Sequence, residues 1–359
     1  MNIIHFGIHN SENGNSGDTV LFKLTQKLFS SYNSNIKWTN KNLWELINIE
    51  EINSHDMLLI GGGGLLLKDQ KGAEKSLSGW QFNCSSELID MINIPIVVFG
   101  IGYNRFRRQE EFDSNFKDTI NKLVKKSIFF GLRNSGSLKK LTQYIENDFH
   151  EKLSIQSCPT VIHDMIEETN HSKLKLSKQK LSFNFAYDRP HFRFLNEKKV
   201  IENLVKFLLW INKEKYDVSI CLHKKLDQKI MDYIPKSEQK DFNIVDISSS
   251  NYENIVQYYL SIDLSIGMRG HSQMIPFGLC KNIISIISHD KMKYFLEDNN
   301  LVDYGVDLDE PEVFENLKKT FNLYENKKND QLKIIEKRKQ LILRQSNSNL
   351  QNIFSHYDK

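Results

Sequence analysis

The sequence has few cysteines and no long apolar run. Its 359 residues include only Cys84, Cys158, Cys221 and Cys280, and no two of them form a C-x-x-C pair. This excludes a disulfide scaffold and a zinc ribbon, and it fits a reducing compartment. Because no stretch of about 18 apolar residues occurs, we expect no transmembrane helix. The first residues run directly into the apolar segment 3–7, with no basic region and no cleavage site, so we expect no signal peptide. We therefore expect a cytoplasmic protein, for which peripheral contact with the inner face of the membrane stays open.

An excess of one charge sign is also missing. The chain has 48 Lys and Arg residues against 45 Asp and Glu residues, for a net charge of +3. Such a small, dispersed excess does not favour nucleic-acid binding. The densest basic segment, Arg105-Phe106-Arg107-Arg108, is short. We interpret it as a solvated face rather than an anion-binding patch.

Short apolar runs alternate with helical patterns along most of the chain. The runs are nearly all apolar, as in parallel strands that are covered on both faces. The predicted strands are 3–7, 57–60, 94–99, 127–132, 153–157, 181–187, 216–222, 242–247, 264–267 and 282–287, and the run at 57–60 is expected to stop at the four glycines 61–64. Helical patterns at 19–29, 111–126, 135–144 and 197–213 lie between them. This alternation predicts an α/β protein built from right-handed crossovers.

The length of the chain favours two domains, because single α/β cores rarely grow far beyond about 250 residues. Residues 167–180 are polar and break the alternation, so we interpret them as a linker. This gives Rossmann-like domains at residues 1–166 and 181–310 that face a cleft, where ligands usually bind. Residues 311–359 form a charged helical tail that is suited to pack back on the first domain.

Two glycine-rich segments follow predicted strands. Gly14, Asn15, Gly17 and Asp18 stand directly before the first helix, whose N-terminal N–H groups can bind an anion. Asp18 is also suited to cap that helix. In the second segment, 61–64, Gly62 and Gly63 make room either for a ligand or for a neighbouring loop.

Two arginines and a histidine are the strongest candidates for chemistry. Arg133 ends a predicted strand, where a guanidinium can hold a carboxylate or a phosphate with two parallel hydrogen bonds. Arg269, Gly270 and His271 form a second strand-to-helix turn. A histidine there can move a proton near neutral pH, although such a residue also occurs merely as a hydrogen-bonding group. No metal-ligand spacing is present, so no metal site is expected.

The order of these segments resembles the polysaccharide pyruvyl transferase family. In sequence they read Gly-Asn-Ser-Gly-Asp, Gly-Gly-Gly-Gly, Gly-Ile-Gly, Leu-Arg-Asn-x-x-Ser, Cys-Pro-Thr and Arg-Gly-His. The resemblance runs from about Ile3 to Leu301, and Lys291 matches a position where family members often carry a lysine. It departs at Asn134, where an aspartate is common, and at Gly270, which replaces a larger residue.

The resemblance implies a fold similar to the glycosyltransferase-B type and transfer of pyruvyl from phosphoenolpyruvate to a sugar of a cell-surface polysaccharide or its precursor, as a ketal. Phosphoenolpyruvate would be held by Arg133, Arg269, Gly270 and His271, with His271 as the acid and no further cofactor. The base that would take a proton from the acceptor hydroxyls is not identified by the resemblance, and Asp188 is only a guess for it. The acceptor would be a glycan or a lipid-linked sugar. Two alternatives stay open: a glycosyltransferase that uses a nucleotide sugar, and a non-catalytic glycan-binding protein.

Overall fold

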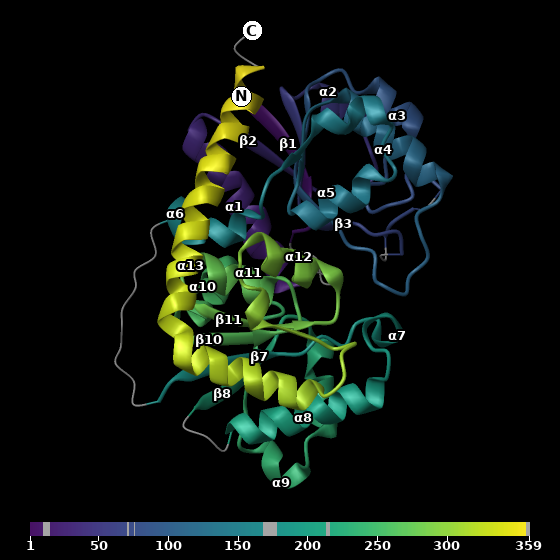
Figure 1. The fold of residues 1–359 in the computed structure, drawn as a ribbon. Coiled ribbons are helices and arrows are strands. Elements are labelled where there is room, and N and C mark those ends of the chain that lie inside the picture. Colours follow the sequence, from purple (N-terminus) through teal and green to yellow (C-terminus); the bar gives the residue numbers. More distant parts are fainter. Residues whose placement is uncertain (10–14, 70–71, 75, 168–177, 213–215, 357–359) are drawn as a thin grey trace.

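The protein is described by a computed structural model that covers residues 1–359 except 10–14, 70–71, 75, 168–177, 213–215 and 357–359. Two six-stranded sheets, parallel in every pairing, form its two halves (Figure 1). In order across the first sheet the strands are β2 (Lys37–Asn42), β1 (Asn2–Gly7), β3 (Met57–Leu66), β4 (Ile96–Tyr103), β5 (Ser127–Leu132) and β6 (Leu153–Ile155). In the second they are β12 (Gly305–Asp307), β11 (Asn282–Ile287), β10 (Leu264–Gly267), β7 (Lys180–Asn184), β8 (Asp217–Leu222) and β9 (Asn243–Asp246). The predicted α/β class with two Rossmann-like halves is confirmed.

Helices cover both sheets. In the first half and the connection they are α1 (Ser16–Tyr32), α2 (Ile49–Asn53), α3 (Ser86–Met91), α4 (Ser114–Lys126), α5 (Ser135–Thr142) and α6 (His163–Ile166). In the second half they are α7 (Pro190–Arg193), α8 (Glu197–Asn212), α9 (Lys236–Gln239), α10 (Tyr252–Leu260), α11 (His271–Gly278), α12 (Asp290–Asp298) and α13 (Val313–Ser355). Short 3-10 helices occupy Asn147–Lys152, Pro159–Ile162, Lys225–Tyr233 and Val302–Tyr304. No helix among the described residues is both long and apolar enough to cross a bilayer.

Two long helices tie the halves together. In α1, Val20 and Leu24 are buried with Ile275 of the second half, whereas Leu28 and Phe29 join the core of the first sheet. Helix α13 packs on α8 and bends at Lys327, where the backbone leaves the helical region. Its last turns place Leu350, Ile353 and Phe354 against Ile3 and Phe29, so the tail runs along both halves (Figure 1). Both helices bury apolar surface in each half, which stabilises one relative arrangement of the two sheets.

The four glycines do not end their strand as predicted. Strand β3 continues through them to Leu66, with positive φ at Gly62 (83°) and Gly63 (96°). A Cβ atom at Gly62 would lie only 2.8 Å from Cγ of Leu21, so the glycine lets α1 pack closely on the strand. The linker prediction falls largely on residues 168–177, which lie outside the described residues.

Two strands were not predicted. Strand β2 reads Lys-Trp-Thr-Asn-Lys-Asn and has no fully buried residue, because it lies at an edge of the sheet. Strand β12 has three residues and forms an edge of the second sheet. Neither presents the apolar run by which the other strands were recognised.

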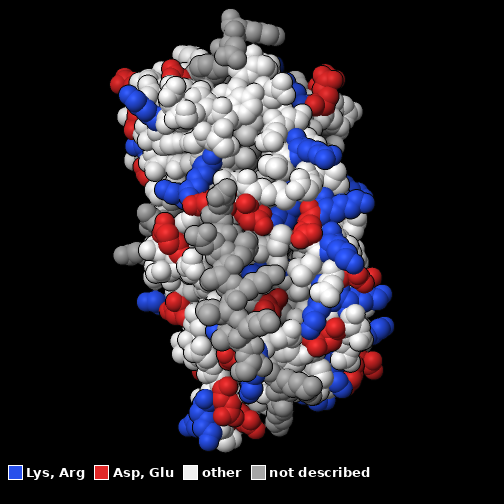
Figure 2. Space-filling view, turned by 90° about the vertical axis from the view of Figure 1, so that its left-hand side faces the viewer, with Lys and Arg blue, Asp and Glu red and all other residues white. Residues whose placement is uncertain are grey.

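On the face in Figure 2, Lys and Arg side chains are intermixed with Asp and Glu.

Candidate functional site

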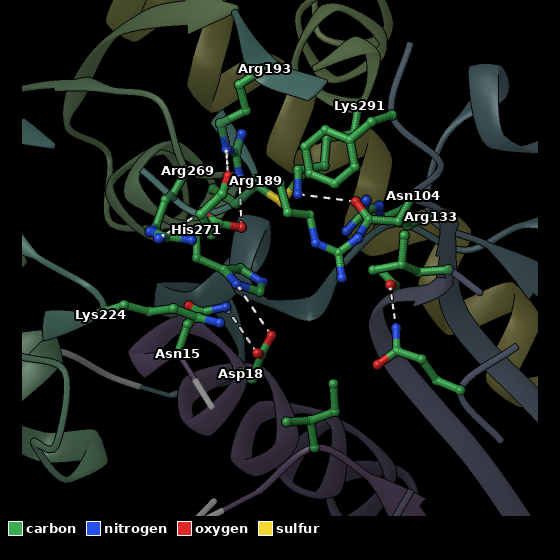
Figure 3. A pocket seen from close by; sticks show the side chains of 18 of the residues that line it. Asn15, Asp18, Asn104, Arg133, Arg189, Arg193, Lys224, Arg269, His271 and Lys291 are labelled. Atoms are coloured by element: carbon green, nitrogen blue, oxygen red, sulfur yellow. Dashed lines mark hydrogen bonds and ion pairs between the residues drawn. The ribbon is translucent and has the colours of Figure 1, made fainter. Parts of the chain in front are cut away.

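A cavity of about 110 Å³ lies between the two halves, at the carboxyl ends of the strands (Figure 3). Parallel sheets bind ligands at this edge, where the loops diverge. The first half contributes strand β3, the start of α1 and the loops after β1, β2, β3, β4 and β5. The second half contributes the segments that follow β7, β8, β10 and β11. The lining residues are Ile8, Asn15, Asp18, Trp44, Gly64, Leu67, Gln81, Asn104, Phe106, Arg133, Asp188, Arg189, Arg193, Lys224, Arg269, Gly270, His271, Met274 and Lys291.

The N-terminal turn of α1 forms one wall of the cavity. Asn15 caps the helix, because its side-chain oxygen accepts from Gly17 N at 2.9 Å. The prediction that Asp18 is the cap is wrong. Asp18 instead accepts a hydrogen bond from Asn15 Nδ2 at 2.9 Å and faces the cavity, and burial raises the pKa of its carboxyl group. The carboxylate of Asp18 is therefore free of a capping role and can contact a ligand in the cavity.

Arg133 is a buried cation with free donors. It follows β5, is 7% exposed and points into the cavity (Figure 3). Its Nε and Nη2 atoms have no hydrogen-bond partner within the described part of the chain. A side chain at Gly102 would lie 2.1 Å from Arg133 Nε, so this glycine makes room for the guanidinium. Burial lowers the pKa of Arg133, but an arginine stays charged at neutral pH. Two unpaired donors on a buried charge are costly unless an anion occupies the cavity.

Arg269 is held by two carboxylates. Its Nε donates to Asp227 Oδ2 at 2.8 Å, and its Nη2 lies 2.9 Å from Asp188 Oδ1. Arg193 donates to both oxygens of Asp188 at 3.0 Å. Burial alone would raise the pKa of Asp188, but the charges of Arg193, Arg269 and Lys224 hold it well below its usual range. Such a carboxylate is a poor proton acceptor, so the structure does not support the guess that Asp188 is the base.

His271 begins α11 and is almost fully buried, at 6% exposed. Its Nδ1 lies 3.8 Å from Asp18 Oδ1, and its Nε2 lies 3.8 Å from Cys158 Sγ. Burial, together with the charges of Arg133 and Lys291, lowers its pKa to about 3. The imidazole is therefore neutral at neutral pH while the cavity holds no anion.

Lysines add two more cations. Lys291 is half-buried beside the arginines, and its Nζ donates to Asn104 Oδ1 at 3.0 Å (Figure 3). Burial and the charges of Arg133 and Arg193 hold the pKa of Lys291 well below its usual range. Lys224 follows β8 and also lines the cavity, and burial and Arg269 lower its pKa. Burial is the larger cause of both shifts, and the neighbouring arginines add to it. An excess of positive charge of this kind is a property of anion-binding sites.

The basic segment after β4 is not a solvated face, contrary to our interpretation. Arg107 pairs with Asp290 at 2.5 Å, with Asp307 at 2.7 Å and with Asp309 at 3.0 Å. All three carboxylates belong to the second half of the molecule. Phe106, the neighbour of Arg107, packs against His289 with ring centroids 4.4 Å apart and lines the cavity. The segment closes the cleft between the halves by ion pairs.

The structure brings most of the predicted site residues together. Asn15, Asp18, Arg133, Arg269, Gly270, His271 and Lys291 line the same cavity. Gly17 lies against His271, whereas Gly62 and Gly63 pack under α1 and are not in the lining. Gly14 lies outside the described residues.

Several residues of the site were missed. Lys224 stands two residues beyond the end of β8, and that position was a usable signal. Arg193 and Asp227 gave none, because they lie on a four-residue helix and on a 3-10 helix with no recognisable motif. Among the described residues, no group of three or more His, Cys, Asp or Glu side chains is placed to hold a metal ion.

Comparison with known proteins gives a family and a fold. The family model described as polysaccharide pyruvyl transferase matches residues 15–290. No curated protein matches the chain. The UDP complex of MnaA from S. aureus is 11% identical, with a TM-score of 0.57 over 93% of this chain and 90% of that one.

Two further solved structures are similar. A UDP-GlcNAc 2-epimerase from Neisseria meningitidis, bound to UDP-GlcNAc, is 12% identical, with a TM-score of 0.55 over 99% of this chain and 100% of that one. A putative UDP-N-acetylglucosamine 2-epimerase from Listeria monocytogenes is 9% identical, with a TM-score of 0.58 over 99% of this chain and 96% of that one. At such identities the likeness establishes the fold alone, which is of the glycosyltransferase-B type.

Proposed function

Because the chain belongs to the polysaccharide pyruvyl transferase family, we propose that it transfers a pyruvyl group from phosphoenolpyruvate to a sugar of a cell-surface polysaccharide or its precursor. The product would be a cyclic ketal. The observation that carries the proposal is the charge of the cavity, whose lining holds six Lys and Arg residues and two carboxylates. Phosphoenolpyruvate joins a carboxylate and a phosphate on one small skeleton, which suits a narrow, strongly cationic site.

Arg133 is the principal donor-binding residue in this proposal. Its Nε and Nη2 atoms are buried and unpaired, so a carboxylate or phosphate can accept both without displacing a protein partner. Arg269 contributes positive charge to the donor site, but its Nε and Nη2 atoms already pair with Asp227 and Asp188. A multiply charged anion would raise the lowered pKa values of Lys291 and Lys224 toward the usual value.

His271 is the proposed acid. Burial and, to a smaller extent, the charges of Arg133 and Lys291 lower its pKa to about 3. The donor would neutralise those two cations, so its binding should raise that pKa. The imidazolium would then protonate the methylene carbon of phosphoenolpyruvate, and positive charge would develop at the adjacent carbon. One acceptor hydroxyl adds to that carbon and loses its proton. A second hydroxyl displaces phosphate, which leaves with the remaining proton equivalent, and the ketal closes.

Neither a metal nor a further cofactor is part of this proposal. The guanidinium and ammonium groups hold the donor, and phosphoenolpyruvate itself supplies the activated carbon. Turnover should therefore continue in excess chelator. A glycan or lipid-linked acceptor would place the reaction in the cytoplasm, at the inner face of the membrane when the acceptor is lipid-bound.

Donor binding separates the proposal from its rivals. We expect phosphoenolpyruvate to bind the wild-type protein in calorimetry, and UDP-GlcNAc to bind much more weakly. Tight binding of UDP-GlcNAc, with none of phosphoenolpyruvate, would favour a glycosyltransferase that uses a nucleotide sugar, which the fold also permits. Binding of neither donor would favour a non-catalytic glycan-binding protein.

A further inference from the structure

The lining of the cavity includes uncharged residues as well as cations. Ile8, Trp44, Gly64, Leu67 and Gln81 carry no charge, and we call these five residues the neutral lining. All five come from the first half of the molecule. Asn104 joins the two sets, because its Oδ1 accepts from Lys291 and its side chain lies against Gly64. A ligand that reached the neutral lining as well as Arg133 would therefore meet neutral hydrogen-bonding groups besides the cations.

Gln81 presents a fixed, unpaired acceptor. The residue is 2% exposed, and its Nε2 donates to Gly64 O at 2.9 Å and to Leu65 O at 3.1 Å. Because two backbone carbonyls can be satisfied only by the amino group, this contact fixes which way the amide points. Oε1 is left buried with no partner within the described part of the chain. A buried carbonyl in that state requires a donor, and a ligand hydroxyl supplies one.

Trp44 adds the complementary group. Its Nε1 is buried and has no partner in the described ranges. Gly72, with φ of +93°, packs against the indole so closely that a Cβ would lie 2.9 Å from Cγ of Trp44. An indole combines a flat apolar face with one N–H donor. Together with the acceptor of Gln81 and the apolar Ile8 and Leu67, it suits a neutral ligand that carries several hydroxyl groups.

We infer that the neutral lining binds the acceptor sugar, with Gln81 Oε1 accepting from a sugar hydroxyl and Trp44 Nε1 donating to a sugar oxygen. The inference rests on the proposed function for the identity of the donor. It adds the place of the acceptor and the residues that select it. Neutral groups in the same cavity as the anion-binding arginines bring a hydroxyl next to the donor without adding another charge.

Sugar binding can be measured without turnover. The probes are the p-nitrophenyl glycosides of glucose, galactose, mannose and their N-acetylated forms, studied by saturation-transfer NMR with and without phosphoenolpyruvate. Trp44→Phe keeps the ring and removes the donor, and Gln81→Ala removes the acceptor. The matched control for Gln81 is Gln239, which also donates to two backbone carbonyls, of Met231 and Ile234, but does not line the cavity. Trp210→Phe, on α8, is the control for Trp44.

We expect each test variant to raise the dissociation constant of the bound glycoside about threefold to tenfold, the effect of one hydrogen bond. Phosphoenolpyruvate should bind both variants as it binds the wild type, and the two controls should bind both ligands normally. The inference is overturned if no glycoside binds the wild type, or if Trp44→Phe binds the glycoside unchanged. It is also overturned if affinity for both ligands falls together. Gln81-dependent glycoside binding without phosphoenolpyruvate binding would instead refute the proposed donor and leave the sugar site standing.

Discussion

Gly17 and His271 are in direct contact across the cleft: a Cβ atom on Gly17 would lie 2.2 Å from both Cβ and Nδ1 of the histidine. The first turn of α1 can approach the second half of the molecule only because this position has no side chain. The approach also sets Asp18 Oδ1 3.8 Å from His271 Nδ1. The first glycine segment therefore positions the histidine, besides lining the cavity with Asn15 and Asp18.

Replacing Gly17 with alanine should displace His271. The added methyl group has no room, and overpacking of this kind costs about 1–3 kcal/mol. We expect Gly17→Ala to lower both the unfolding midpoint and the turnover number. Gly270→Ala is the control for stability, since the nearest atom to a Cβ there is Lys291 Cε at 3.9 Å. Equal unfolding midpoints for the two variants would show that the contact is not tight.

His271 should take up a proton when the donor binds. Burial, with the charges of Arg133 and Lys291, lowers the pKa of His271 to about 3, and the negative charge of phosphoenolpyruvate should raise it. Calorimetry at pH 8, in buffers of different ionisation enthalpy, measures the uptake at a pH where a phosphate monoester, with a second pKa of about 6, is already deprotonated. We expect His271→Gln to abolish the uptake and to lower turnover about a hundredfold. Uptake that persists in the variant would assign the proton to another group, such as Lys291.

Arg133 should matter more for donor affinity than Arg269. Arg133→Lys removes the two-pronged donor from the site, and we expect a loss of about 1–3 kcal/mol in phosphoenolpyruvate binding. Arg269→Lys should act mainly on stability, because it deprives the buried Asp227 of its partner. Calorimetric affinity and thermal unfolding, measured on both variants, separate the two effects. A larger loss of affinity in Arg269→Lys than in Arg133→Lys would reverse these roles.

Stability should fall between pH 7 and pH 5. Burial lowers the pKa of His5 to about 3, of His163 to about 4 and of His271 to about 3, and it holds those of His223 and His289 well below the usual range. In the unfolded chain these groups titrate near 6.5, so below that pH the unfolded state binds more protons. Each such histidine removes up to about 2 kcal/mol of unfolding free energy by pH 5.

Urea unfolding at pH 7 and at pH 5 measures this loss. Asp18 acts in the opposite direction, since burial raises the pKa of its carboxyl group. The histidines outnumber it, so a net decrease is expected. His5→Gln should make the pH dependence less steep than in the wild type. An unfolding free energy that is the same at both pH values would contradict the assignment of these histidines as buried and neutral.

The strands of the core were predictable because parallel strands that are covered on both faces are nearly all apolar. Ile3 to Gly7 and Asn282 to Ile287 show this directly, and the edge strand β2, with no fully buried residue, shows why it was missed. The four glycines were misplaced for another reason. Gly62 lets Leu21 of α1 pack closely on the strand. Because α1 lies elsewhere in the sequence, the local glycine pattern did not reveal this contact.

The clearest signal for the site was a residue at the end of a strand, whereas Asn15 and Asp18 were found from the glycine segment before α1 and Lys291 from the family resemblance. Arg133 and Arg269 could be found this way, and so could Lys224. Whether an arginine is free or paired depends on the tertiary fold. Arg107 looked solvated and pairs with three aspartates, whereas Arg133 keeps its donors unpaired. No local pattern distinguishes these two arginines.

The most direct test of the account is the product itself. Wild-type protein is incubated with phosphoenolpyruvate and a panel of glycan acceptors, and the products are examined by mass spectrometry, with His271→Gln in parallel. We predict that at least one acceptor gains a single ketal-linked pyruvyl group with release of one phosphate, and that the variant forms about a hundredfold less of it. Transfer of a sugar from a nucleotide donor to the same panel, with no pyruvylated product, would contradict the account.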